Sequence, residues 1–269
     1  MEPPLGSRHE LLRWTKNVLQ EYGIRPYKKL SQNFVVEPRI IKDILSVVGS
    51  RNSIVLEIGA GLGTLTYYLA QENDYVIAVE IDERLVEILS RIAPWNTDIV
   101  VGDALKHFNT NYRGVIVSNV PYHISSLLII GILRTRAHKA VLMLQKEVAL
   151  RLVAKPGSSD YGRLSVIAQY IADIQLITVY PPRCFYPSPE VASALVVLRR
   201  KRVWGNEAEI IENLTRCLFS EKNKLAVKVV KKCAPLIPKE LLKDLREKRV
   251  RDLSLNDILI ISRYVKSTI

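Results

Sequence analysis

The stretch that decides the fold is IVLEIGAGLG, residues 54–63. Its first half is a nearly unbroken apolar run with β-branched residues, which is typical of a strand buried on both faces of a sheet. Three alternate glycines follow, and they predict a tight turn into a helix where a ligand can approach the backbone closely. A plain strand-to-helix turn without a ligand is the alternative at this point.

Comparable apolar runs recur along the chain, separated by windows with helical spacing. The alternation predicts a doubly wound α/β domain with a mainly parallel sheet and right-handed crossovers. The expected strands are Ser53–Ile58, Tyr75–Val79, Asp98–Val101, Gly114–Val117 and Ala140–Leu144, and the expected helices are Arg8–Tyr22, Glu37–Val48, Leu62–Ala70 and Glu83–Arg91.

The pattern changes after Gly162. A helix over Arg163–Ile171 precedes two apolar runs, Ile174–Val179 and Ser193–Leu198, which we expect to pair as an antiparallel edge of the sheet. Only helical patterns follow, so we place a domain boundary near residue 200, with residues 1–200 (including an N-terminal helical segment, 8–30) before a small all-α domain of residues 201–269. The expected C-terminal helices are Ile210–Phe219, Leu225–Lys232, Lys239–Leu245 and Asn256–Val265.

Two carboxylates follow the second and third predicted strands. Glu80 stands 21 positions after Gly59 (80 − 59), where a carboxylate can accept hydrogen bonds from both hydroxyls of a ribose. Asp82 is a weaker candidate because strand alternation points it elsewhere. Asp103 follows the third strand and can accept a hydrogen bond from the amine of an adenine. With no phosphate-cradling lysine motif, the pair suits a cationic adenosine ligand such as S-adenosylmethionine, while a dinucleotide shares the geometry and stays open.

The fourth predicted strand ends in Ser118-Asn119-Val120-Pro121-Tyr122, which suits methylation of an exocyclic amine. The lone pair of an adenine N6 is delocalised into the ring, so this nitrogen is a poor nucleophile. If the Asn119 side-chain oxygen and the Pro121 carbonyl accept its two N–H bonds, the nitrogen is drawn towards tetrahedral geometry. Proline stiffens this presentation through its fixed φ, and Tyr122 offers a face on which the base can stack.

The charge of the chain indicates an anionic partner. It has 39 Lys+Arg and 27 Asp+Glu, a formal net charge of +12. Residues 200–252 contribute 15 basic and 8 acidic side chains, a surplus of 7. This cluster is compatible with a solvated helical face and with binding to a phosphate backbone, and the second reading requires that the rest of the chain act on nucleic acid.

The cysteine, histidine and hydropathy patterns argue against several classes of protein, namely disulfide-rich, metal-binding, membrane-spanning and secreted proteins. Cys184, Cys217 and Cys233 are far apart and odd in number, so we expect neither a disulfide framework nor a zinc site. No apolar run reaches the length of a membrane span, and the polar N-terminus lacks a signal-peptide pattern, so we expect a cytoplasmic protein. The four histidines lack the spacing of metal ligands: His9, His107, His123 and His138.

Taken together, these motifs resemble the KsgA-type family of ribosomal RNA adenine N6,N6-dimethyltransferases. The resemblance covers residues 25–255 in one unbroken order, with small departures at Val35, Val120 and Tyr186. The segments that carry it are SQNFV (31–35), EIGAGLG (57–63), EID (80–82), GDA (102–104), NVPY (119–122), QKEV (145–148), YGRLS (161–165), FYPSPEVASA (185–194) and KRVRDLS (248–254).

The resemblance implies a Rossmann-like class I methyltransferase domain with a seven-stranded sheet and S-adenosylmethionine as cofactor, leaving S-adenosylhomocysteine as product. Asn33 and Val35 would contact the methionine end of the cofactor. Gly59 and Gly61 would lie beneath it, and the two carboxylates would bind its ribose and adenine as expected above.

It also implies the catalytic residues Asn119, Pro121, Tyr122 and Phe185, with Asn119 contacting both cofactor and target amine. Phe185 would be the second stacking face, opposite Tyr122, although an ordinary core aromatic is the alternative.

The implied reaction gives two methyl groups to each of two neighbouring adenines in the 3'-terminal hairpin loop of small-subunit rRNA. The implied partner is the pre-ribosomal small subunit, which the protein would bind through its basic C-terminal domain during ribosome biogenesis. We expect the protein to be a monomer. Methylation of large-subunit rRNA, as in related antibiotic-resistance enzymes, an assembly factor with secondary catalysis, and a dinucleotide-dependent oxidoreductase are the alternatives.

Overall fold

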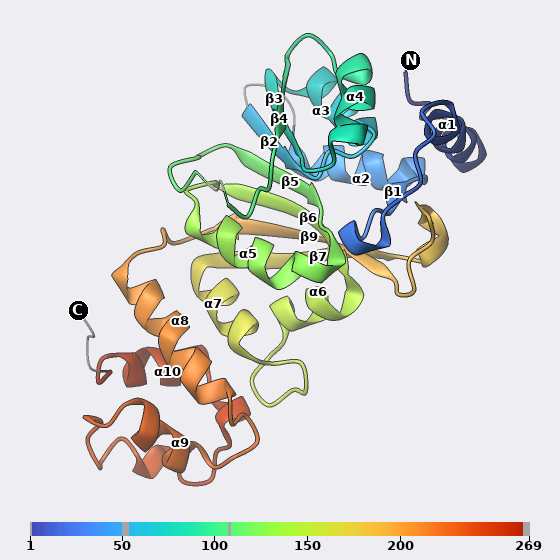
Figure 1. Ribbon diagram of the computed structural model, residues 1–269. Coiled ribbons are helices and arrows are strands. Elements are labelled where there is room, and N and C mark those ends of the chain that lie inside the picture. Colours follow the sequence, from blue (N-terminus) through green and yellow to red (C-terminus); the bar gives the residue numbers. More distant parts are fainter. Residues whose placement is uncertain (1, 50–53, 107–108, 266–269) are drawn as a thin grey trace. The chain divides into compact units, whose positions relative to one another are not determined.

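The computed structural model of the chain describes residues 2–49, 54–106 and 109–265 (Figure 1). The predicted strand start at Ser53, the residue His107 and the last four positions of the expected C-terminal domain lie outside these ranges.

The strands of the described residues form a seven-stranded sheet in the order β4-β3-β2-β5-β6-β9-β7. The pairs β2–β3, β2–β5, β3–β4 and β5–β6 are parallel, whereas β9 runs antiparallel to β6. The predicted doubly wound sheet with an antiparallel edge is therefore confirmed. Its strands are β2 (Ile54–Ile58), β3 (Tyr75–Glu80), β4 (Thr97–Val101), β5 (Val115–Asn119), β6 (Lys139–Gln145), β7 (Ala172–Tyr180) and β9 (Ser193–Arg200).

Burial explains why the central strands read as unbroken apolar runs. Val115, Ile116 and Val117 of β5 are at most 1% exposed, although consecutive side chains point to opposite faces of the sheet. Both faces are therefore covered, as in other parallel sheets. The edge strand β4 is more open: Val100 and Val101 are among the exposed apolar residues.

A second sheet, which the sequence did not predict, pairs β1 (Phe34–Val35) antiparallel with β8 (Phe185–Tyr186). Two residues in each strand are too few for a periodic signal. The pair nevertheless has a consequence for the site, because it ties the segment before the main sheet to the proline-rich segment near residue 185.

The helices around the sheet begin with local signals that the sequence contains. Helix α1 (Arg8–Glu21) starts at a capping box in which Ser7 and Glu10 satisfy each other's backbone N–H groups. Helix α2 (Pro38–Val48) has proline in its first turn and buries its apolar stripe in the core. The other helices of this part are α3 (Thr64–Glu72), α4 (Glu83–Ile92), α5 (Ser125–Arg134) and α6 (Lys146–Val153).

By its contacts the chain divides into two compact units. One comprises Met1–Ala149 and Gln175–Arg199, and the other Leu150–Ile174 and Arg200–Ile269. The segment 150–174, which the sequence places in the first domain, thus falls in the unit of the C-terminal helices. The assignment of residues 1–200 to catalysis and 201–269 to RNA binding stays a prediction.

In the second unit, α8 (Asn206–Phe219) contacts α7 (Arg163–Ile171), α9 (Ala226–Cys233) and α10 (Leu255–Ser262). Glu212 of α8 is only 3% exposed and forms ion pairs with Arg163 and Arg216. A buried carboxylate needs such partners, since removing it from water is costly.

The expected helix Lys239–Leu245 is wrong: only a 3-10 turn, Lys243–Leu245, forms within it. Its backbone bonds join residues three apart, such as Leu245 N to Leu242 O. The two buried leucines, Leu242 and Leu245, have a spacing that one 3-10 turn satisfies as well as an α-helix does.

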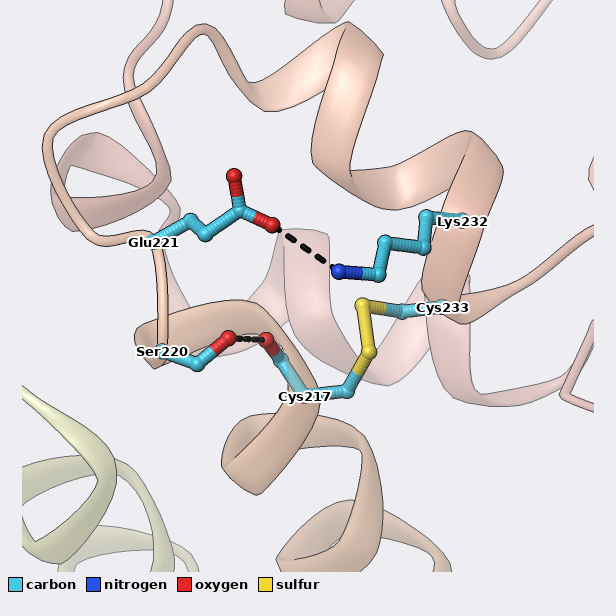
Figure 2. Close-up of a disulfide and its surroundings, with 5 residues drawn as sticks. All are labelled: Cys217, Ser220, Glu221, Lys232 and Cys233. Atoms are coloured by element: carbon cyan, nitrogen blue, oxygen red, sulfur yellow. Dashed lines mark hydrogen bonds and ion pairs between the residues drawn. A yellow bond between two sulfur atoms is a disulfide. The ribbon is translucent and has the colours of Figure 1, made fainter.

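The cysteine pattern led us to expect no disulfide framework, but the structure contains one disulfide. Cys217 on α8 and Cys233 at the end of α9 form a disulfide, beside an ion pair of 3.1 Å between Glu221 and Lys232 (Figure 2). Pairing depends on how α8 and α9 pack, and a separation of 16 residues contains no such information. Cys184 is buried and free.

Within the described ranges, no helix combines the length and the apolar character needed to cross a membrane. In the same residues, no three His, Cys, Asp or Glu side chains gather where they could hold a metal ion.

We predict that breaking the disulfide destabilises the second unit. A cross-link across 16 residues lowers the entropy of the unfolded chain by an amount worth about 3 kcal/mol. The Cys217→Ser/Cys233→Ser variant, or the wild type with dithiothreitol, should therefore show faster hydrogen exchange of the α9 amides. Dithiothreitol should not change exchange in the variant, which serves as the control. Equal protection in all four samples would contradict the prediction.

Candidate active site

The site lies at the carboxyl ends of the neighbouring strands β2 and β5, where the strand order of the sheet reverses. From this point the strand order runs through β3 and β4 on one side and β6 on the other. Ile58 and Ser118 are paired at the strand ends, and the Ser118 hydroxyl donates to the Ile58 carbonyl at 2.8 Å. In open α/β sheets the carboxyl ends of strands at such a point form a ligand crevice.

The turn after β2 requires its glycines. Gly61 has φ +60°, and a Cβ atom there would lie 3.3 Å from the Phe34 ring. Gly63 has φ +80°, and its Cβ would meet Leu89 at 2.8 Å. The left-handed backbone at both positions strains any larger residue, and a Cβ atom at either position would also require its neighbour to shift.

A cavity of about 170 Å³ opens at this point, wholly within the first unit. The structure brings together residues that the sequence predicted from separate motifs. The predicted residues in its wall are Asn33, Gly59, Gly61, Glu80, Asp103, Asn119 and Pro121.

Glu80 is held by backbone N–H groups. One carboxylate oxygen accepts from Gly61 N at 2.8 Å, and the other accepts from Ile81 N and Asp82 N, both at 2.9 Å. Burial raises the pKa of this carboxyl, and the three donors oppose that shift. The Gly61-bonded oxygen retains a lone pair, so Glu80 can still accept a hydrogen bond from a ligand hydroxyl in the cavity.

The other carboxylates of this region behave differently. Asp103 accepts from Leu105 N at 3.0 Å, which fixes one of its oxygens at the cavity wall. Asp82 is outside the wall residues and caps α4 by accepting from Arg84 N at 3.2 Å. The sequence argument that favoured Glu80 over Asp82 agrees with these positions.

Asn119 has a side-chain orientation that the chemistry of its partner dictates. Its Nδ2 donates to the backbone carbonyl of Asn33 at 2.8 Å. Because a carbonyl oxygen can only accept, the nitrogen of the amide must face Asn33 and the oxygen must face away. No donor from the described residues reaches that oxygen, so Oδ1 is available as an acceptor.

Pro121 and Tyr122 continue from Asn119 into a short 3-10 turn, Tyr122–Ile124. The Pro121 carbonyl accepts from Ile124 N at 3.2 Å, and the Ser125 hydroxyl lies 3.4 Å from the same oxygen but closer, at 3.0 Å, to the Tyr122 carbonyl. Because a hydroxyl has a single proton, its shorter bond to Tyr122 leaves the second lone pair of Pro121 for a ligand. The Tyr122 hydroxyl bonds Ser193 at 2.6 Å, and burial raises the pKa of this phenol. The ring is thus anchored at its far end.

Three predicted residues, Val35, Tyr122 and Phe185, are absent from the cavity wall. Val35 and Phe185 are 8% and 2% exposed and belong to the same hydrophobic core, paired across the small β1–β8 sheet. This position matches the alternative reading of Phe185 as a core aromatic. A stacking role would require the ring to leave the core, so we do not propose one.

The cavity suits S-adenosylmethionine. Carboxylates on two neighbouring strands, β3 and the end of β4, supply separate acceptors for a ribose hydroxyl and an adenine amine. Apolar side chains, including Ile58 and Leu85, line the space between, and the negative charges favour a cationic ligand.

Comparison with known proteins decides the family. The family model described as ribosomal RNA adenine dimethylase matches residues 25–266. The chain belongs to this family. It is a S-adenosylmethionine-dependent rRNA adenine dimethyltransferase.

Named relatives agree with this assignment. The chain is 34% identical to the "Probable ribosomal RNA small subunit methyltransferase A" of Pyrococcus abyssi over 93% of its length and 95% of that protein. The protein of the same name in Thermococcus gammatolerans is 37% identical, with 93% of each chain covered.

Solved structures share the fold. A dimethyladenosine transferase from Plasmodium falciparum superimposes with a TM-score of 0.73 at 28% identity, covering 85% of this chain and 95% of that one. The 23S rRNA methyltransferase ErmE gives a TM-score of 0.62 at 24% identity, covering 87% and 100%, a likeness that shows the fold alone.

A buried acid outside the cavity wall lies on β2 next to Ile58, and no role of its own was predicted for it from the sequence. Glu57, 2% exposed, accepts a hydrogen bond of 2.5 Å from the Thr66 hydroxyl. Burial raises its pKa to about 8 and nearby Glu80 adds to the shift, although Thr66 opposes it. Its place in a buried strand, one residue before Ile58, was the available signal.

We predict that Glu57 makes stability fall as pH rises. Its folded pKa of about 8 exceeds the ordinary 4.5, so between these values the unfolded chain has lost the proton and the folded chain retains it. The free energy of unfolding therefore falls across this window. Glu57→Gln keeps the acceptor for Thr66 but cannot titrate, so urea unfolding at several pH values should show a flatter profile. Parallel profiles for variant and wild type would contradict this.

Proposed function

We propose that this dimethylase transfers two methyl groups to each of two adjacent adenines in the 3'-terminal hairpin loop of small-subunit rRNA, during ribosome biogenesis. The observation that carries the proposal is the fixed amide of Asn119, which presents an acceptor oxygen at the cavity wall. The small-subunit target is supported by the names of the archaeal relatives, which match nearly the whole chain.

Bound S-adenosylmethionine supplies a methyl group activated by its sulfonium centre. The chain's own residues present the nucleophile. The oxygen of Asn119 and the carbonyl of Pro121 each accept one N–H of the adenine amine, so that its lone pair is freed from the ring. Tyr122, held through its hydroxyl by Ser193, provides a face for the base, which is flipped from its stack.

The same acceptors serve the second transfer. A monomethylated amine retains one N–H, which one of the two oxygens can hold while the methyl group takes the other position. No strong base is required at the site, because the nitrogen becomes cationic during transfer and then loses its proton readily. This accounts for the absence of histidine from the predicted catalytic set.

We propose that the second unit binds rRNA through exposed basic side chains. Lys224, Lys228 and Lys231 lie on or just before α9 with their side chains exposed. They carry part of the excess positive charge of residues 200–252. A lysine surface of this kind binds phosphates without regard to sequence and so positions the particle. We further propose a cytoplasmic monomer that acts on the pre-ribosomal small subunit.

Asn119→Ala should abolish methyl transfer while S-adenosylmethionine binding changes less than about tenfold, or 1.4 kcal/mol. The variant removes the acceptor for the target amine but leaves Glu80 and Asp103 in place. Transfer is measured with tritiated cofactor and small-subunit particles, and binding by calorimetry. Asn111→Ala, an exposed loop substitution, is the matched control. Full activity of Asn119→Ala would overturn the proposed role.

Primer extension locates the product, since dimethylated adenines block copying. Wild-type protein should produce two adjacent stops near the 3' end of small-subunit rRNA. Stops in large-subunit rRNA would instead support the antibiotic-resistance type of reaction, and no stops would support an assembly factor.

Replacing Lys224, Lys228 and Lys231 by glutamine should weaken rRNA binding and flatten its salt dependence. Each lost phosphate contact lowers the slope of log K against log salt by about 0.7–0.9, so three lower it by about 2–3. Cofactor affinity should stay unchanged, because the cavity lies in the first unit. Filter binding at several salt concentrations provides the slope.

The control for this triple variant removes three exposed charges from the first unit. It should bind rRNA with the wild-type slope. Equal slopes of log K against log salt for all three proteins would show that these lysines of the second unit interact with solvent and do not bind the rRNA backbone. The control positions are Arg13, Lys42 and Arg113.

A further inference from the structure

A polar network joins the segment before the sheet to the start of α4. Gln32 donates through Nε2 to Asp82 Oδ2 at 2.7 Å and accepts through Oε1 from Tyr27 N, also at 2.7 Å. One side chain therefore bridges the backbone of its own segment and a carboxylate on a neighbouring element. Neither Gln32 nor Tyr27 was a candidate from the sequence.

Asp82 is fixed in turn by Arg84. The guanidinium forms two hydrogen bonds with the carboxylate, from Nε at 2.9 Å and from Nη2 at 2.6 Å. Such a paired geometry is both strong and directional. The Arg84 hydrogen bonds lower the pKa of Asp82, so it is a carboxylate at neutral pH. The guanidinium also stacks on Tyr27, with its Cζ atom 3.6 Å from the ring centre. Arg84 therefore contacts the same residue whose backbone N–H binds Gln32.

The same segment holds the catalytic asparagine. Asn33 follows Gln32 directly, and its carbonyl accepts the hydrogen bond from Asn119 Nδ2. One residue earlier, the Ser31 hydroxyl bonds His123 Nδ1 at 3.0 Å. The segment thus contacts both the start of α4 and the Asn119–His123 stretch.

We infer that Gln32 and Asp82 are positioning residues for methyl transfer: through Asn33 they hold the backbone carbonyl that orients the Asn119 amide. This inference rests on the proposed function, since it gives Asn119 Oδ1 the target amine. If the carbonyl of Asn33 moves, the Asn119 amide can rotate and present its NH₂ group to the base. A donor in that position opposes the N–H groups of the amine.

A reciprocal exchange tests the inference. Gln32→Glu alone sets two carboxylates against each other, and we expect kcat to fall at least about tenfold. Adding Asp82→Asn lets the new amide donate to the new carboxylate at the net charge of the wild type, while the amide oxygen still accepts from Arg84 Nε. The amide nitrogen cannot accept the bond that Arg84 Nη2 donates to Oδ2 in the wild type, so we expect the double variant to recover kcat at least about threefold over Gln32→Glu without reaching the full wild-type value. Gln20→Glu, an exposed change of the same type on α1, should have wild-type kcat.

A second readout does not depend on turnover. The Asn119 side-chain NH₂ protons, assigned by their absence in Asn119→Ala, should exchange slowly in wild type, fast in Gln32→Glu, and slowly again in the double variant. A general loss of structure would not be repaired by the second substitution.

The outcomes separate the two claims. Wild-type kcat and slow exchange in Gln32→Glu, or no recovery in the double variant, would overturn the positioning role. A wild-type protein that transfers no methyl group would overturn the proposed function, while the exchange rates would still decide whether Gln32 and Asp82 orient Asn119.

Discussion

The hydrogen bond from Asn119 Nδ2 to the Asn33 carbonyl is the constraint on which the chemistry of this molecule depends. It decides which end of a nearly symmetric amide faces the cavity, and a methyl acceptor with two N–H groups requires the oxygen. The bond joins positions 86 residues apart in the chain. It can form only because β5 lies beside β2 in the sheet and the N-terminal segment crosses their carboxyl ends.

The glycine loop and the side chains at the strand ends shape the cavity next to Asn119. The glycine loop lets backbone approach closely, and one of its amides, at Gly61, helps to orient Glu80. The carboxylates and the asparagine come from different strand ends, so the sheet sets their spacing. Glu80 and Asp103 are the carboxylates in the cavity wall, whereas burial of the neighbouring Glu57, outside the wall, raises the pKa of its carboxyl.

The sequence was sufficient for features with a local or periodic signal. Apolar runs predict the buried strands. The motifs at the strand ends identify Glu80, Asp103 and Asn119 as candidate site residues, because parallel strands end at one edge of the sheet. Features that depend on tertiary packing could not be predicted from the sequence. The burial of Phe185 follows from a two-residue strand pair, and the Cys217–Cys233 disulfide from the packing of two helices. The Gln32 network and the orientation of Asn119 likewise depend on contacts between distant segments.

The most direct test of this account is a crystal structure of the protein with S-adenosylhomocysteine and an RNA hairpin that contains the target adenines. The account predicts that the adenine N6 lies within about 2.7–3.2 Å of Asn119 Oδ1, with Nδ2 of the same side chain still on the Asn33 carbonyl. An adenine amine held by other groups, or an Asn119 amide turned with its nitrogen towards the base, would contradict it.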